Sequence, residues 1–156
     1  MKNLLMVLAV VSIFVSCEAT VESDVTTDDK PRINTDGPLK GKVGGASFEA
    51  KSGSIKKSFD EYRVSIFESA HEDPCNVFMP QENQVFFTFD GSTGATYLSM
   101  QDNITIYDYE HTINLITTEG YYDLIEMGDE TAKMKIKASF DNSTYIGGEV
   151  TLKVCD

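Results

Sequence analysis

Basic residues are scarce in this chain of 156 residues, which holds 13 lysines and arginines against 25 aspartates and glutamates. The formal net charge is −12, and no lysine or arginine occurs between Arg63 and Lys133. A surface of this sign repels the phosphates of nucleic acids and the headgroups of anionic lipids. We therefore expect no nucleic-acid partner.

Residues that perform catalysis or hold metals are also few. There are two histidines, His71 and His111, and the chain contains no nucleophile-elbow, paired-histidine or phosphate-loop motif. His71 and Cys75 have a four-residue spacing that suits zinc, but zinc needs further ligands and Cys75 has a better use in a disulfide. We therefore predict that the protein is not an enzyme and carries no metal or cofactor. A hydrolase, with a serine or an acid beside one histidine, is the less favoured alternative.

Acidic side chains gather at several expected turns, and their oxygen atoms are the ligands that calcium prefers. These clusters are Asp90 with Ser92, Asp102-Asn103, Asp108 with Glu110, and Asp129-Glu130. None has the spacing of a known calcium loop. We interpret them as solvated turns, with calcium binding as the alternative.

Only one long apolar run is present, from Leu4 to Val15. A positively charged start precedes it, and Ser16 and Cys17 follow it. This order is typical of a secretory signal, and the run is too short to span a bilayer stably. Residues 1–16 are therefore predicted to be a signal peptide.

The end of this leader, Phe14-Val15-Ser16-Cys17, resembles the lipobox of bacterial lipoproteins. In that family the cysteine after the cleavage site is lipidated and becomes the new N-terminus. The resemblance implies that Cys17 carries a lipid and that this lipid holds the protein on the membrane of the bacterial cell envelope. Glu18 stands where an aspartate resembles an inner-membrane retention signal, which favours the outer membrane.

The chain after Cys17 divides into a polar segment and a folded domain. Residues 17–38 hold six acids, two bases and no aromatic residue, which is too little apolar surface to offset the entropy of ordering. We predict a tether over residues 17–38 and a single domain over residues 39–156. With Cys17 lipidated, Cys75 and Cys155 remain as an even pair in an oxidising compartment, and we predict a disulfide between them.

Apolar residues in the domain recur with a period of two, which indicates strands, and no stretch has the helical period of 3.6. Strands are expected near residues 39–43, 46–50, 62–66, 85–89, 104–106, 113–115, 121–127, 133–138 and 149–154. Parallel pairs need long crossover segments, so we expect an all-β, antiparallel β-sandwich of about eight strands. A closed up-and-down β-barrel is the alternative. The irregular stretch from Ser69 to Asn83 is expected to be a long loop, and long loops often carry function.

Several aromatic residues are difficult to place in one core. Phe86 points away from its neighbours Val85 and Phe87, and tyrosines at 97, 107, 109, 121 and 122 are also hard to bury together. Exposed rings on a rigid sheet can stack on sugars or dock a protein. A second core layer is the alternative that we favour for these rings.

Most of the chain resembles the small uncharacterised lipoproteins that are abundant in Bacteroidota. The resemblance rests on the lipobox, the acidic tether, the opening Gly-Lys-Val-Gly-Gly-Ala-Ser-Phe-Glu-Ala, a mid-chain cysteine and the closing Gly-Gly-Glu-Val-Thr-Leu-Lys-Val-Cys. It implies a periplasmic or surface-exposed β domain and supplies no catalytic residues. We expect a non-enzymatic binding or envelope-accessory domain with a protein or glycan partner. A lipocalin-like carrier of a small apolar ligand is the alternative.

Overall fold

The computed structural model describes residues 30–156, and these form eleven strands and one short 3-10 helix. The signal peptide and Cys17 lie outside the described residues. The elements are β1 (Lys40–Val43), β2 (Ala46–Glu49), β3 (Ser52–Ser58), β4 (Glu61–Phe67), η1 (Pro74–Asn76), β5 (Gln84–Phe89), β6 (Gly94–Tyr97), β7 (Ile104–Asp108), β8 (Ile113–Thr117), β9 (Glu119–Met127), β10 (Thr131–Ser139) and β11 (Tyr145–Cys155). The all-β prediction is therefore confirmed.

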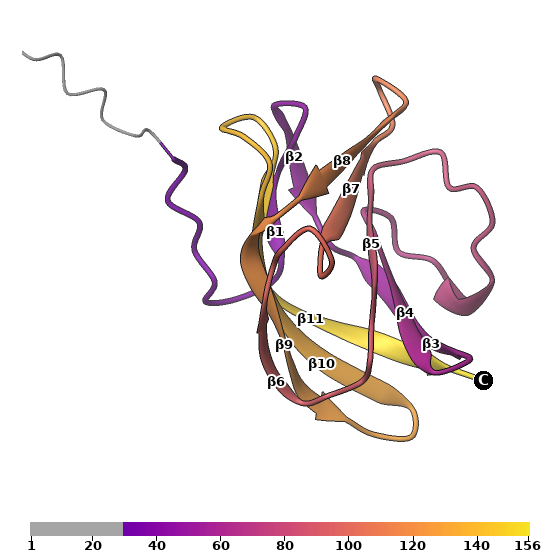
Figure 1. The fold of residues 1–156 in the computed structure, drawn as a ribbon. Helices are drawn as coiled ribbons and strands as arrows, with labels where there is room; N and C mark the ends of the chain where they lie inside the picture. The colour runs from indigo at the N-terminus through magenta and orange to yellow at the C-terminus, as the bar shows by residue number, and fades with distance from the viewer. Residues whose placement is uncertain (1–29) are drawn as a thin grey trace, which may run out of the picture.

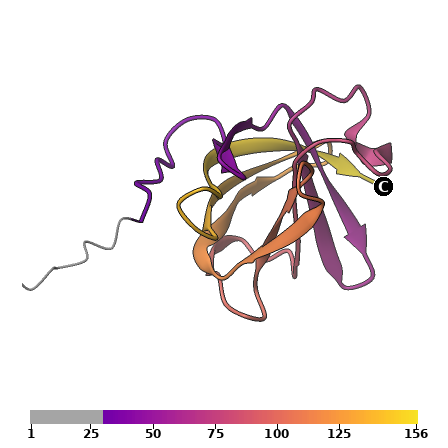
Figure 2. The same cartoon turned by 90° about the horizontal axis from the view of Figure 1, so that it is seen from above.

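All of these strands belong to one sheet, whose main path runs β6-β9-β10-β11-β3-β4-β5-β7-β8. The β1–β2 hairpin branches from it, because β1 pairs with the first part of β11. Figures 1 and 2 show that the sheet curls into an open half-barrel. In place of the two separate layers of a sandwich, the two halves of a single sheet face each other. The order ends at β6 and β8, so the barrel does not close.

Pairing is antiparallel between the strands of the described chain, as predicted, with one exception. The end of β11 runs parallel to β3, with Val154 opposite Ile55. Parallel pairing was excluded from the sequence because no single crossover segment is long enough. In the structure, these two parallel strands are joined by the whole chain between β3 and β11. That chain contains eight further elements and runs around the half-barrel.

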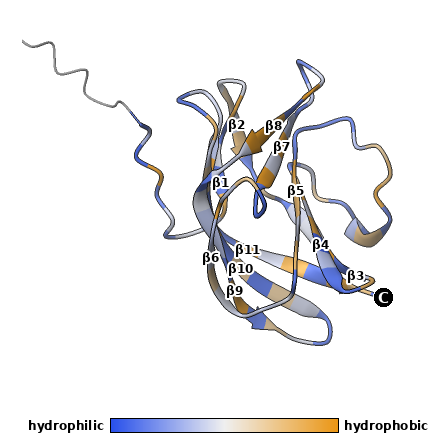
Figure 3. Ribbon diagram, in the orientation of Figure 1, coloured by the Kyte–Doolittle hydropathy of each residue, from blue (hydrophilic) through white to orange (hydrophobic). Residues whose placement is uncertain are grey.

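Core residues line the inside of this curl, because alternate residues of each strand point inward. Figure 3 shows polar and apolar segments following one another along β10 and β11. Phe87 on β5 stacks on Tyr122 on β9 with ring centroids 5.0 Å apart. These strands are far apart in the sheet order, so this contact crosses the interior and joins the two halves. The fully buried members of the core include Phe48, Ile66, Ile106, Met134, Ile136 and Leu152.

Two strands were missing from the sequence prediction. In β3, Gly53, Ser54 and Ile55 are all buried, and Lys56 to Ser58 are exposed, so the strand shows no alternation. In β6 the four residues Gly94–Tyr97 are short and mostly exposed, and they pair only with β9. Both strands are defined by their hydrogen-bonded partners and carry little apolar signal of their own.

The described part of the predicted tether contacts the sheet. The Leu39 amide donates to the Glu149 carbonyl and the Glu149 amide donates to the Gly37 carbonyl, each at 2.8 Å. Lys135 lies 3.5 Å from Asp36. Within residues 30–156, no helix is long and apolar enough to cross a membrane.

Candidate functional site

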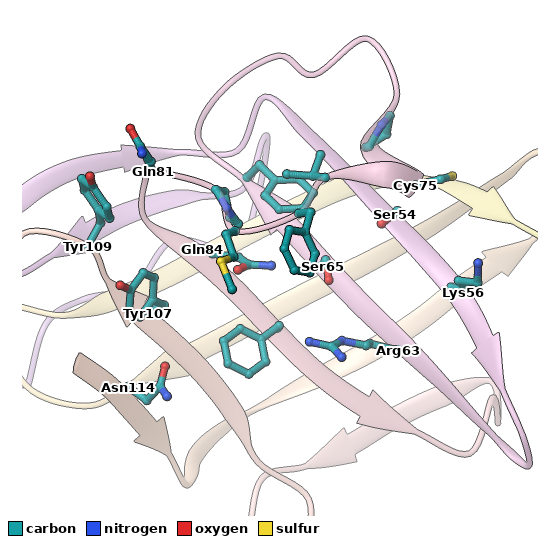
Figure 4. A pocket seen from close by; sticks show the side chains of 17 residues that line it. Ser54, Lys56, Arg63, Ser65, Cys75, Gln81, Gln84, Tyr107, Tyr109 and Asn114 are labelled. Carbon is teal, nitrogen blue, oxygen red and sulfur yellow. The ribbon is translucent and has the colours of Figure 1, made fainter. Parts of the chain in front are cut away.

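A groove of about 730 Å³ lies on the outer face of β3, β4, β5, β7 and β8. A cavity of this size falls in the range of small-ligand sites. Figure 4 shows Lys56 and Arg63 toward one end and Tyr107, Tyr109 and Asn114 toward the other. We call it the outer groove, and its lining is Ser54, Lys56, Arg63, Ser65, Phe67, Pro74, Cys75, Val77, Phe78, Met79, Pro80, Gln81, Gln84, Phe86, Tyr107, Tyr109 and Asn114.

Strand register builds the floor of the outer groove as cross-strand rows. One row joins Ser54, Ser65 and Phe86, which are direct neighbours on β3, β4 and β5. A second row runs from Gln84 on β5 to Tyr107 on β7 and Asn114 on β8. The same strands point Ile55, Val64 and Val85 inward, so the alternation that fills the core also presents this polar and aromatic face.

The loop over residues 68–83 forms the other wall of the groove, and it is fixed to the end of β11. Cys75 and Cys155 lie at disulfide-bonding distance with Cα atoms 5.8 Å apart, as predicted. Next to them, Lys153 Nζ donates to Asp73 Oδ1 at 3.0 Å. Hydrogen bonds from Asn76 and then Lys153 lower the pKa of Asp73. Because the disulfide joins the loop to β11, it holds the loop beside the groove.

The part of the loop nearest the groove exposes apolar side chains. Phe78 is 85% exposed and Met79 is 77% exposed, although both line the groove. Met79 also has a positive φ of 50°, a conformation that residues other than glycine seldom adopt and that occurs often at binding sites. The loop thus presents a ring and a thioether beside the aromatic floor.

The base of the loop is held by His71. Its Nε2 lies 2.5 Å from Glu82 Oε1, and its ring packs edge-on against Phe67 with centroids 4.9 Å apart. Ser52 Oγ accepts from the backbone amide of His71 and donates to the carbonyl of Ser69. In the described residues no hydroxyl bonds to the His71 ring, so this arrangement fixes the loop and lacks the serine contact of a hydrolase.

His111 also has a carboxylate partner, at the turn between β7 and β8. Its Nδ1 lies 2.8 Å from Oδ2 of the buried Asp108. The hydrogen bond and then the charge of Asp108 raise the pKa of His111 above its ordinary value. Asp108 Oδ1 accepts the His111 backbone amide as well, so this pair stabilises the turn.

The residues that the sequence suggested as metal ligands do not form a metal site in the described chain. Of the two candidate zinc ligands, Cys75 is paired with Cys155, whereas His71 bonds to Glu82. Asp90 accepts the amide of Ser92 within its own turn. Within residues 30–156, no group of three or more histidine, cysteine, aspartate or glutamate side chains is arranged to hold a metal ion.

Charge distinguishes the outer groove from the rest of this acidic protein. Of the described residues, no aspartate or glutamate lines the groove, whereas Lys56 and Arg63 do. The ion pairs of the described chain involve neither base. The guanidinium of Arg63 lies 5.9 Å from the centroid of the Phe86 ring. The groove therefore combines aromatic faces, amides, hydroxyls and two cations without an ion-pair partner.

A second hollow of about 310 Å³ continues the groove along the sheet. It shares Arg63 and Phe86 with the outer groove and adds the amides of Gln101 and Asn103. It too has no acidic residue of the described chain in its lining. Arg63 and Phe86 thus stand between two adjoining hollows on the outer face.

The structure separates the aromatic residues that the sequence grouped together. Tyr122 is 3% exposed and belongs to the core. Phe86, Tyr107 and Tyr109 lie in the outer groove, so a second core layer is wrong for these three. Lys56 and Arg63 were not recognised from the sequence; Arg63 borders the long stretch without bases, and Lys56 has no comparable signal.

Comparison of the chain with known protein families, with curated proteins and with solved structures found no match.

Proposed function

We propose that this protein is a non-enzymatic binding domain of the bacterial cell envelope that holds a carbohydrate in the outer groove. The observation that carries the proposal is the lining of the groove. Half-buried Phe86 and Tyr107 alternate there with the side chains of Ser65, Gln84 and Asn114. Sugars present apolar C–H faces and hydroxyl edges, which match aromatic rings and amide or hydroxyl groups respectively.

A carbohydrate fits this groove better than a peptide does. Extended peptides usually bind by adding a strand to a sheet edge, where backbone groups are unpaired. The groove lies on the face of β3, β4, β5 and β7, each of which is paired on both sides within the sheet. It therefore offers side chains as partners, and a ligand rich in hydroxyl groups can use them.

The lipid anchor is the second part of the proposal, and it rests on the lipobox resemblance around Cys17. In Figure 1, residues 30–38 leave the sheet on the side away from the loop over residues 68–83. A lipid on Cys17, joined to the domain through this segment, would leave room for the groove to face away from the membrane.

The two other candidate functions have less support. A carrier of apolar ligands needs an internal cavity, but the interior of the curl is filled by a continuous cluster that includes Phe87, Phe89 and Tyr122. A hydrolase needs a nucleophile beside a histidine; the rings of His71 and His111 bond to the carboxylates of Glu82 and Asp108, and no serine, threonine or cysteine side chain of the described residues bonds to either ring. The outer groove is therefore the site that we assign to the ligand.

An array of oligosaccharides, followed by isothermal calorimetry on each one bound, tests the proposal. We expect Phe86→Ala and Tyr107→Ala to weaken binding by about 0.5–1.5 kcal/mol for each ring removed from the sugar. Tyr97→Ala is the matched control, because Tyr97 is 76% exposed and lies outside the groove. Absence of any bound oligosaccharide, or an equal loss in the Tyr97 variant, would contradict the assignment.

A further inference from the structure

We infer that the carbohydrate of the outer groove carries a carboxylate, as a uronic-acid unit does, and that Lys56 and Arg63 bind this group. This inference rests on the proposed function, because it names the class of sugar that the same groove takes. It depends on three observations: the register of the two cations, the absence of acids from the lining of the groove that they border, and the ring beside Arg63.

Strand register places the two cations against each other. Lys56 on β3 and Arg63 on β4 are direct cross-strand partners, and both are on the outer face. Like charges in this position destabilise a sheet. The chain has almost twice as many acids as bases, yet none of the described carboxylates pairs with either cation. An anion bound between them would relieve the repulsion.

Several other lysines of the described chain are ion-paired. Lys51, Lys133 and Lys153 each lie within 3.0 Å of a carboxylate oxygen. Lys56 and Arg63 differ from these three because their side chains border a hollow whose lining has no acid. They are therefore free to meet a carboxylate supplied by a ligand.

A carboxylate on a sugar ring fits the surroundings of Arg63. The planar guanidinium can bind a carboxylate through two parallel N–H···O bonds. The Phe86 ring beside it offers a face for the apolar side of the same sugar. Since the two adjoining hollows share Arg63 and Phe86, the acidic unit would sit where they meet, with neighbouring sugars on either side.

The experiment uses the full chain purified in detergent and an array of neutral and uronic-acid oligosaccharides. Calorimetry then compares the tightest binder with the same oligosaccharide in which the carboxyl groups are methyl esters. We expect esterification, and separately the double variant K56A/R63A, to weaken binding about tenfold or more, because bonds to charged groups are the strong ones. Binding of the acidic form should also weaken as sodium chloride is raised.

The matched control is K42A/K57A, which removes the same net charge from exposed lysines outside the groove. Loss of binding in K56A/R63A with retention in K42A/K57A supports the inference. Equal binding of the acid and its ester, or acidic binding that survives K56A/R63A, overturns the inference and leaves the carbohydrate function standing. No bound oligosaccharide, or binding of an aspartate-rich peptide in their place, overturns both.

A stability measurement separates a binding role from a structural one. If Lys56 and Arg63 serve the ligand, removing one of two opposed cations should leave the melting temperature of the ligand-free protein unchanged or raise it. The variant to measure is Lys56→Ala, with Lys57→Ala as its neighbour on the same strand. A lower melting temperature together with undiminished binding would show that Lys56 supports the fold, and would overturn its assignment.

Discussion

The bond between Cys75 and Cys155 closes a loop of 80 residues, and its removal gives the most quantitative test of this fold. In the chain-entropy account, a cross-link of this length restricts the unfolded chain by about 4.5 kcal/mol at 25 °C. The bond also holds the loop over residues 68–83 to β11. We therefore expect Cys75→Ser with Cys155→Ser to lower the free energy of unfolding by about 3–4.5 kcal/mol.

Urea unfolding followed by far-ultraviolet circular dichroism measures this loss, with Cys17 changed to Ala in both proteins so that only the pair differs. With a slope of about 2 kcal/mol per molar urea, the midpoint should fall by about 1.5–2.3 M. A reductant should produce a similar fall in the parent and none in the double variant. Asp73→Asn is the control, because it removes the charge that pairs with Lys153 between the same two elements and keeps a side-chain oxygen that can accept from the Cys75 amide. It should move the midpoint much less than loss of the disulfide does, because exposed ion pairs contribute little to stability.

Two results would refute this reasoning. Complete alkylation of Cys75 and Cys155 in the unreduced protein would show that the bond does not form. A midpoint that moves by no more than that of Asp73→Asn would show that the bond forms but contributes little, and that the remaining contacts of the loop hold it equally well.

Two further predictions concern β1 and the turn between β7 and β8. A Cβ atom at Gly41 would overlap the backbone carbonyl of Tyr145 on the neighbouring strand, so Gly41→Ala should lower the free energy of unfolding by about 2 kcal/mol or more, measured by urea unfolding. Gly128→Ala is the control: the nearest atom to its Cβ is 3.3 Å away, and the loss should be less than about 1 kcal/mol. Proton NMR of the His111 ring should give a pKa above about 6.5 in the native protein, returning toward that value in Asp108→Asn. Because this folded-state pKa is raised, the contribution of the imidazolium to stability is complete below the unfolded pKa and is lost as pH rises through the folded pKa. A native pKa at or below the unfolded value would contradict the pairing.

The sequence predicted the parts of this protein that depend on local pattern. Alternation in β10, where Met134 and Ile136 point inward, and the Gly44-Gly45 hairpin were visible because each signal lies within a few residues. The long loop and the unusual position of Phe86 were visible for the same reason. These features sufficed for the all-β class, but the favoured interpretation of Phe86 as part of a second core layer was wrong.

What remained hidden depends on register between strands that are distant in sequence. Nothing near Lys56 indicates that Arg63 lies opposite it, because β3 has no alternation and was not recognised as a strand. The parallel pairing of β3 with β11 brings together segments about a hundred residues apart. The approach of Phe78 and Met79 to the sheet follows from that pairing and from the disulfide beside it. The groove is thus a property of the assembled sheet, and no single segment encodes it.

The position of β11 has a consequence for the order in which the molecule assembles. β11 is the last strand along the chain, yet it lies between β10 and β3 in the middle of the sheet. Until it docks, β3 has an unpaired edge, and such edges invite pairing with other chains. Contacts of this sequence separation form slowly, in milliseconds to seconds for comparable β proteins. Cys155 reaches Cys75 only with the same docking, so we expect the wall of the groove to be completed late in folding. A protein halted before that docking would lack its binding site even if other strands had already paired.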